Sequence, residues 1–272
     1  MEKLTMLDYV KETPGVLRTN IEQYIALVEP LMKEVQQKEI KRILLVASGS
    51  SHNACYCARS FVEKVSGLEV RIITPYTFTY YENDIKENDL VLVVTQSGLS
   101  TNAIEALKII KKKQCRAICL TGNKNSDVKD VADVVIEYGV GEELVGYVTK
   151  GVSTLALFLD LFAITYSGKT EYLEELKKAV NLNEEMIEKA TEFIELHYKE
   201  FSSMSWVYSC GAGANYGTAL ESALKMGETI HIPSCCYEIE EYIHGPNLQL
   251  TPQYNVIFFD GNDGASHRVE QV

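Results

Sequence analysis

Three charged side chains near residue 225 have the types and the spacing that proton transfer requires. Glu221, Lys225 and Glu228 stand at positions i, i+4 and i+7, so on a helix all three project from one face. A carboxylate beside an ammonium group in a partly dry crevice can move a proton next to a carbonyl group. The same spacing is also typical of solvated, salt-bridged helix faces, which is the alternative interpretation. His244 is a further candidate, because its place in a Gly-Pro turn favours an exposed ring.

Two hydroxyl-rich turns, each between an apolar run and a helical pattern, could bind an anion. They are Ser48-Gly49-Ser50-Ser51 and Thr95-Gln96-Ser97-Gly98-Leu99-Ser100-Thr101. At the start of a helix the free backbone N–H groups point outward along the positive end of the helix dipole, which favours a group such as phosphate. Ser100 or Thr101 is the expected N-cap of the second helix. Either stretch taken alone is also compatible with an ordinary capped turn.

The chain has the alternation of strands and helices that would bring both turns together. Helical patterns separate the apolar runs, so we expect an α/β fold with a doubly wound, flavodoxin-like parallel sheet and helices on both faces. In such a sheet the carboxyl ends of the strands line one crevice, where both turns would lie. The five strands are expected at 43–47, 70–73, 90–94, 116–121 and 134–137.

The same strand–turn–helix plan begins again after a change in composition. Residues 169–199 predict a helical connector, followed by a strand at 206–210, a glycine turn at 211–217 and a helix from Thr218. The next expected strand is Val256–Asp260, and the second domain is expected to be truncated, because such domains need about 100 residues or more. The glycine turn misses the G-x-G-x-x-G spacing, so no dinucleotide site is expected. The predicted segments are N-terminal helices (1–34), a first domain (35–168), the connector (169–199) and the front part of a second domain (200–272).

Composition excludes several classes of partner. The net charge of −12 leaves no basic face for a nucleic-acid backbone. No apolar run reaches the roughly 18 residues that a membrane span needs, and the N-terminus lacks the plan of a signal peptide, so a cytoplasmic protein is expected. The seven cysteines form no C-x-x-C pair, which favours reduced packing thiols over a metal site, and no cofactor is expected.

With these residues assembled, the chain resembles the sugar isomerase (SIS) family of phosphosugar-binding proteins. It is most similar to the isomerase half of glucosamine-6-phosphate synthase and to stand-alone phosphosugar deglycases and deaminases. Ser48-Gly49-Ser50-Ser51 is similar to the family's Cys-Gly-Thr-Ser stretch, and Thr95 to Ser100 is similar to its Ser-Gln-Ser-Gly-Glu-Thr phosphate loop. Residues 219–228 resemble Ala-Leu-Glu-Gly-Ala-Leu-Lys-x-x-Glu, and residues 241–246 match Glu-x-x-His-Gly-Pro.

The resemblance implies a role for each matching residue. Glu228 would be the base of aldose–ketose isomerisation, His244 would assist ring opening, and Lys225 would lie in the same site. It also implies a homodimer in which the histidine comes from the neighbouring chain, and the polar stretch Tyr237–Tyr242 could carry it across. The implied substrate is a sugar 6-phosphate, and the implied substrate-binding residues are Gly49, Ser50, Ser51, Thr95, Gln96, Ser97 and Ser100.

Three departures from the family pattern limit what is expected. Leu99 replaces a glutamate of the phosphate loop, Val148 stands where a hydroxyl is expected, and the chain stops before a C-terminal tail that carries a lysine. Glu2 is not the cysteine nucleophile of a glutaminase domain, so glutamine-driven synthesis is not expected. The favoured hypothesis is a phosphosugar isomerase, deaminase or deglycase that moves a proton between C1 and C2 of an amino-sugar or fructosamine 6-phosphate. The alternative is a phosphosugar-binding, regulatory module without chemistry.

Overall fold

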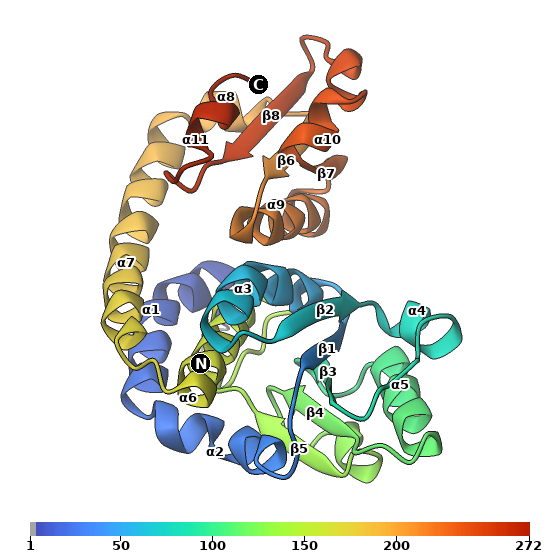
Figure 1. Cartoon of the computed structure of the whole chain (residues 1–272). Helices are drawn as coiled ribbons and strands as arrows, with labels where there is room; N and C mark the ends of the chain where they lie inside the picture. Colours follow the sequence, from blue (N-terminus) through green and yellow to red (C-terminus); the bar gives the residue numbers. More distant parts are fainter. Residues whose placement is uncertain (1–3) are drawn as a thin grey trace. The chain divides into compact units, whose positions relative to one another are not determined.

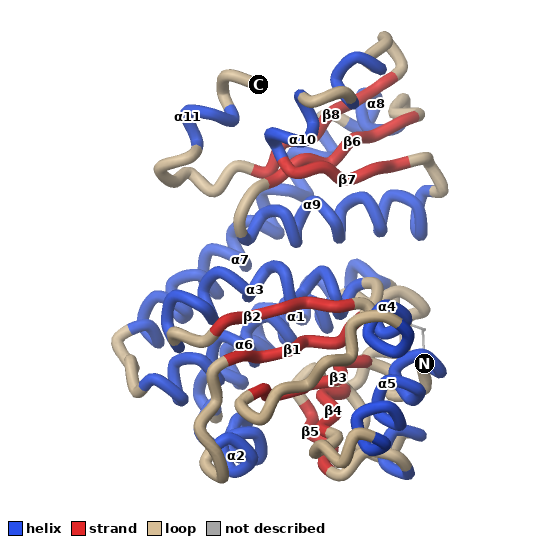
Figure 2. The backbone as a smooth tube through the Cα atoms, turned by 45° about the vertical axis from the view of Figure 1, so that its right-hand side comes forward, coloured by secondary structure: helices blue, strands red, loops and turns tan. Residues whose placement is uncertain are grey.

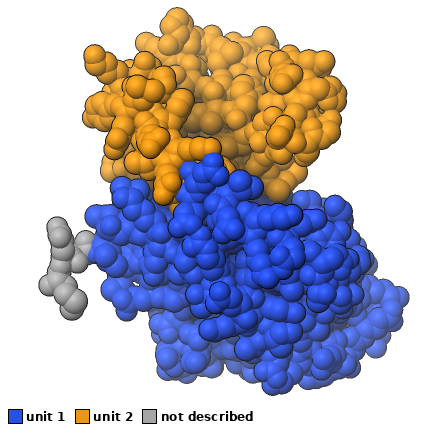
Figure 3. All heavy atoms as spheres, turned by 90° about the vertical axis from the view of Figure 1, so that its left-hand side faces the viewer, with its two compact units in different colours: residues 1–185 blue, residues 186–272 orange. Residues whose placement is uncertain are grey.

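The computed structural model describes residues 4–272 of the chain, which divides into two compact units, 1–185 and 186–272 (Figure 3). Residues 1–3, which include Glu2 and the start of the predicted helical segment 1–34, lie outside the described residues. The division falls inside one long helix, α7 (Tyr172–Leu196), and each unit has its own sheet and core. Within the described range, no helix combines the length and the apolar character of a bilayer span.

The first unit is built on a five-stranded, wholly parallel sheet with the strand order β2-β1-β3-β4-β5 (Figure 1). This is a doubly wound order, as the alternation of strands and helices predicts. Every residue of β3 is buried, which explains its continuous apolar run. The strands are β1 (Arg42–Ala47), β2 (Glu69–Ile73), β3 (Asp89–Thr95), β4 (Ile118–Thr121) and β5 (Val134–Glu137).

Helices cover both faces of this sheet, and alternate side chains of each strand meet them (Figure 2). On β1, Ile43 and Leu45 pack into the cluster of α1, α2, α3 and α6, whereas Leu44 and Val46 pack into that of α4, α5 and η1. The helical elements are α1 (Met6–Glu22), α2 (Tyr24–Val35), α3 (Ser50–Ser66), α4 (Pro75–Tyr80), α5 (Thr101–Lys112), the 3-10 turn η1 (Asp127–Asp130) and α6 (Lys150–Ser167).

The second unit holds a three-stranded parallel sheet with the order β7-β6-β8. Two predictions were wrong here. The strand β7 was missed, because its Ser-Cys-Cys-Tyr-Glu sequence is neither an apolar run nor a clean alternation, and α9 begins at Ala214 instead of Thr218. The elements are α8 (Tyr198–Ser202), β6 (Trp206–Gly211), α9 (Ala214–Lys225), the π-helical turn η2 (Met226–Ile230), β7 (Ser234–Glu238), α10 (Ile239–Ile243), the 3-10 turn η3 (Pro246–Gln249), β8 (Tyr254–Phe259) and α11 (Ser266–Val269).

The core of the second unit is small and aromatic. Tyr208 on β6 is buried, and its ring lies 5.5 Å from that of Tyr254 and 6.0 Å from that of Tyr242. Ile239 and Tyr242 both face this core, so the stretch from Tyr237 to Tyr242 is the end of β7 followed by α10 and is not a free polar arm. All residues of β7 and β8 are only half-buried, in contrast to the fully buried β3.

Candidate functional site

The two hydroxyl-rich turns meet at the carboxyl edge of the first sheet. β1 pairs with β2 on one side and with β3 on the other, so the point where the strand order reverses lies between β1 and β3. Ser48 directly follows β1, and Thr95 ends β3. Asn102 Nδ2 donates a hydrogen bond of 3.4 Å to Ser48 Oγ and joins the two turns. The predicted meeting of the turns is therefore present.

Both turns open a helix, and a helix N-terminus favours an anion. Gly49 is the N-cap of α3 with φ +58°, and Ser100 is the N-cap of α5. Within the described part of the chain, neither N-cap supplies a side-chain hydrogen bond to its helix. Ser100 holds the predicted N-cap position but does not cap, because its Oγ accepts from Thr95 Oγ1 at 3.2 Å. Backbone N–H groups at the start of a helix point outward along the positive end of its dipole, which favours a phosphate.

The phosphate-loop candidate takes its shape from Gly98. Its φ is +66°, and a Cβ at this position would lie 1.8 Å from Ser126 Oγ, so only glycine fits. The loop that follows β4 thus packs directly on the turn, and Val128 N donates to Gly98 O at 3.2 Å. Ser97 is exposed beside this point, whereas the predicted site residues Ser50, Ser51 and Thr95 are each less than a tenth exposed.

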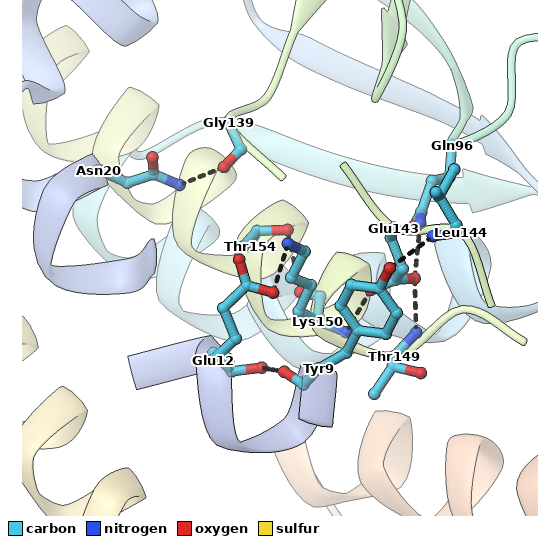
Figure 4. Close-up of polar contacts among 11 residues, drawn as sticks. Tyr9, Glu12, Asn20, Gln96, Gly139, Glu143, Leu144, Thr149, Lys150 and Thr154 are labelled. Carbon is cyan, nitrogen blue, oxygen red and sulfur yellow. Dashed lines mark hydrogen bonds and ion pairs between the residues drawn. The ribbon is translucent and has the colours of Figure 1, made fainter. Parts of the chain in front are cut away.

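Gln96 is held at both ends of its amide, and Figure 4 shows its contact with Glu143. Its Nε2 donates to Glu143 Oε1 at 2.8 Å, and its Oε1 accepts from Tyr138 OH at 3.1 Å. Gln96 is a site residue predicted from the sequence, whereas its two partners were not predicted. They lie 42 and 47 positions further along the chain, in a segment without periodic pattern, and no local signal connects them to the turn.

In the second unit, the three charged side chains are assembled as their spacing predicts. Lys225 Nζ lies 2.6 Å from Glu228 Oε2 and 3.1 Å from Glu221 Oε1. The lysine and Glu221 side chains are about one-seventh exposed and Glu228 about one-third, so the group lies at a partly dry surface. Glu228 is not on the regular helix, because α9 ends at Lys225 and continues as the π-helical turn η2. Such turns are frequent at functional sites.

His244 lies on a different element from these three residues. It is exposed at the C-terminal end of α10, directly before Gly245 and Pro246, as its turn predicts. The pKa of Glu240 lies below its usual range, chiefly because Arg268 donates to its carboxylate, with a smaller contribution from the charge of His244. The exposed His244 ring can be reached by a ligand or by another chain. The Glu221–Lys225–Glu228 cluster lies on other elements of the same unit.

No metal centre is found in the described residues. Between residues 4 and 272, no three His, Cys, Asp or Glu side chains are grouped so that they could hold an ion. All seven cysteines are free thiols.

Part of the first unit, including both turns, is similar to a known family. Residues 38–165 match the SIS domain family, so the match includes both hydroxyl-rich turns and the sheet that carries them. The isomerizing glutamine–fructose-6-phosphate aminotransferase of Clostridium tetani is 28% identical over 255 residues, which are 89% of this chain and 42% of that protein. The chain thus spans about two fifths of the length of the curated relatives it matches.

Solved structures are similar over nearly the whole chain. A candidate phosphosugar isomerase of Clostridium difficile 630 superposes with a TM-score of 0.87 at 26% identity and covers 99% of this chain and 79% of its own. Glucosamine-6-phosphate deaminase of Thermotoga maritima superposes with a TM-score of 0.78 at 22% identity, with coverages of 98% and 80%. At that identity the second likeness concerns the fold alone.

Proposed function

Because residues 38–165 form a SIS domain, we propose that this chain is a phosphosugar enzyme of the isomerase type. Its substrate is an amino-sugar or fructosamine 6-phosphate, and its reaction moves a proton between C1 and C2 of the open-chain sugar. The observation that carries this proposal is the meeting of two hydroxyl-rich helix N-termini at the strand-order reversal, joined by Asn102 and Ser48. The similarity to a protein named for fructose 6-phosphate supports the choice of substrate class.

The phosphate is held by local dipoles and hydroxyls. With a net charge of −12 the whole molecule repels an anion, so binding depends on the first-turn N–H groups of α3 and α5. The exposed Ser97 and the half-buried Ser100 supply further donors from the second turn, and Ser51 supplies one from the first. Thr95 and Gln96 lie beside them and shape the site, since the Thr95 hydroxyl donates to Ser100 and the Gln96 amide is held by Glu143 and Tyr138.

The proton transfer is assigned to the second unit. Glu228 takes the proton from one carbon and returns it to the next, and Lys225, which contacts it at 2.6 Å, orients the carboxylate. His244 donates to the ring oxygen during ring opening. The second unit is a further domain of the same type, and the chain acts in the cytoplasm as a homodimer in which His244 serves the neighbouring subunit's site.

The first test separates binding from chemistry. Sugar 6-phosphates should raise the melting temperature, and the same sugars without phosphate should do so far less. In D2O, fructose 6-phosphate and glucosamine 6-phosphate should then exchange their C1 or C2 protons for deuterium, which NMR detects without knowledge of the amine.

Two variants test the base. Glu228→Gln should lower the exchange rate about 10²–10⁴-fold. Glu221→Gln is the matched control, because it removes one negative charge that contacts the same lysine from one turn earlier. It should lower the exchange rate much less than Glu228→Gln does. Full exchange in Glu228→Gln contradicts the catalytic assignment, and equal thermal shifts with glucose and glucose 6-phosphate contradict the phosphate site.

The alternative is a phosphosugar-binding module without chemistry. Val148, which replaces an expected hydroxyl near the first-unit site, favours it. A panel of sugar 6-phosphates that binds tightly, with no solvent exchange at C1 or C2 for any member, would support this second function.

Mixing two inactive variants tests the shared site. If His244 serves the partner's site, Glu228→Gln and His244→Ala refolded together form mixed dimers with one intact site. Random pairing restores roughly a quarter of the wild-type rate, given the symmetry of a twofold dimer. No recovery, with dimers confirmed, places both residues in one subunit.

A further inference from the structure

The segment between β5 and α6, residues 138–149, is fastened to the first helix although it has no regular structure of its own. Asn20 Nδ2 donates to Gly139 O at 3.0 Å, and Leu144 N donates to Tyr9 OH at 3.0 Å (Figure 4). Both partners come from α1, so the segment is fixed at two points five residues apart. The carboxylate of Glu143 lies between these points.

Glu143 accepts three hydrogen bonds that join three parts of the first unit. Its Oε1 accepts from Gln96 Nε2 at 2.8 Å and from Thr149 N at 2.9 Å, and its Oε2 accepts from Lys150 N at 2.8 Å. Thr149 is the N-cap of α6 but supplies no side-chain cap among the described residues, so the Glu143 carboxylate satisfies the helix start. One carboxylate therefore connects the phosphate-loop candidate to the N-terminus of α6.

The start of α6 is shaped to receive the Gln96 side chain. A Cβ on Gly151 would lie 1.7 Å from Gln96 Oε1, so the amide occupies the space that any other residue would fill. Tyr138 OH donates to the same oxygen. The amide is thus enclosed by the helix start, a buried tyrosine and a carboxylate, and its orientation is fixed.

The helix start is itself anchored by a buried charge. The Lys150 side chain is 2% exposed, and its Nζ lies 3.0 Å from Glu12 Oε2 and 5.1 Å from the centre of the Tyr9 ring. Because Lys150 cannot move without breaking this pair, the two N–H groups that bind Glu143 are rigid donors. The chain of contacts runs from α1 through Lys150 and Glu143 to Gln96.

We propose that Glu143 is a positioning residue of the phosphosugar site, which acts by fixing the Gln96 amide against α6. This inference rests on the proposed function, since it concerns the same site. A carboxylate offers only acceptors to three donors, whereas an amide at position 143 would turn an NH2 group toward at least one of them. Glu143→Gln therefore keeps the size of the side chain and disrupts its hydrogen bonds.

The test compares Glu143→Gln with Glu142→Gln, which removes the same charge from the exposed neighbouring position. Calorimetry should show that Glu143→Gln weakens binding of the sugar 6-phosphate about tenfold or more, while Glu142→Gln leaves it near the wild-type value. Residue-resolved hydrogen exchange should show faster exchange of the Thr149 and Lys150 amides in Glu143→Gln alone. Equal affinities in the two variants overturn the proposal.

A double-mutant cycle with Gln96→Ala separates positioning from a general structural effect. If Glu143 acts through Gln96, adding Glu143→Gln to Gln96→Ala costs no further affinity. If the fold-losses in affinity of the two substitutions multiply instead, the proposal is overturned, because Glu143 then affects binding by a route other than Gln96.

The exchange measurement also distinguishes this inference from the proposed function. A wild-type protein that binds no sugar phosphate refutes the proposed function, but Gln96→Ala must still speed exchange of the Thr149 and Lys150 amides if the two loops form one unit. Unchanged exchange in Gln96→Ala refutes the inference on its own.

Discussion

Whether Gly151→Ala stabilises or destabilises the protein depends on one close contact. In an open helical position, alanine in place of glycine stabilises by at most about 1 kcal/mol. Here the new Cβ would lie 1.7 Å from Gln96 Oε1, so the amide must leave its place. Gln96 then loses a hydrogen bond to the Glu143 carboxylate, worth about 1.5–3 kcal/mol, and one from the buried Tyr138, worth about 0.5–1.5 kcal/mol. These losses sum to about 2–4.5 kcal/mol, so after the gain of about 1 kcal/mol the net expectation is a destabilisation of about 1–3.5 kcal/mol.

Hydrogen exchange of the slowest amides in β1 and β3 measures this change without assuming that the two units unfold together. Since each 1.4 kcal/mol is a factor of ten, these amides should exchange roughly five to three hundred times faster in Gly151→Ala. Gly15→Ala is the matched control, because Gly15 lies within α1 with open space around its Cβ position, and it should exchange no faster than wild type.

The decisive comparison places Gly151→Ala in a Gln96→Ala background. The three atoms nearest to the new methyl group all belong to the Gln96 amide, so removing the amide removes these clashes and Gly151→Ala should become neutral or stabilising. A Gly151→Ala variant that is more stable than wild type while Gln96 is present would refute the reasoning.

Three further predictions follow from other parts of the structure. Ser97→Ala should reduce the thermal shift given by a sugar 6-phosphate, since one charge-assisted hydrogen bond is worth about 1.5–3 kcal/mol; an unchanged shift removes Ser97 from the site. Amides of the buried β3 should exchange more slowly than those of the half-buried β8, and equal protection would show that something further covers the second sheet. Burial alone would raise the pKa of Asp89, but hydrogen bonds from Arg42 and Lys86 N outweigh it and lower the pKa. Wild type should therefore have a higher free energy of unfolding than Asp89→Asn above about pH 4, and this difference should shrink as the pH falls below that value. A difference that does not change with pH contradicts this expectation.

The sheet and the two turns of the first unit could be predicted from sequence because each signal is local. The apolar run at 90–94 has no polar residue, and a strand buried on both faces needs none. The spacing of Glu221, Lys225 and Glu228 likewise places them on one face whether or not the last turn is α-helical. These signals need only a few neighbouring residues.

Other features could not be predicted because they depend on partners far along the chain. β7 is held by pairing with β6, and its half-buried residues carry no continuous apolar run. Glu143 becomes significant only through Gln96, and Ser100, a good N-cap by type, gives its oxygen to Thr95 instead. The π-helical turn at Glu228 has no sequence signature among the residues on either side.

The polar contacts between α1 and the residues after β5 determine when α1 can reach its final packing during synthesis. Tyr9, Glu12 and Asn20 bind residues 119 to 138 positions later, and Leu17 and Ile21 of the same helix belong to a core that α6 completes. At about 5–20 residues per second, the ribosome needs on the order of ten seconds to deliver those partners. For that interval the apolar side of α1 has no final place to pack. The first unit can therefore complete its core only after Lys150 and the rest of α6 have left the exit tunnel.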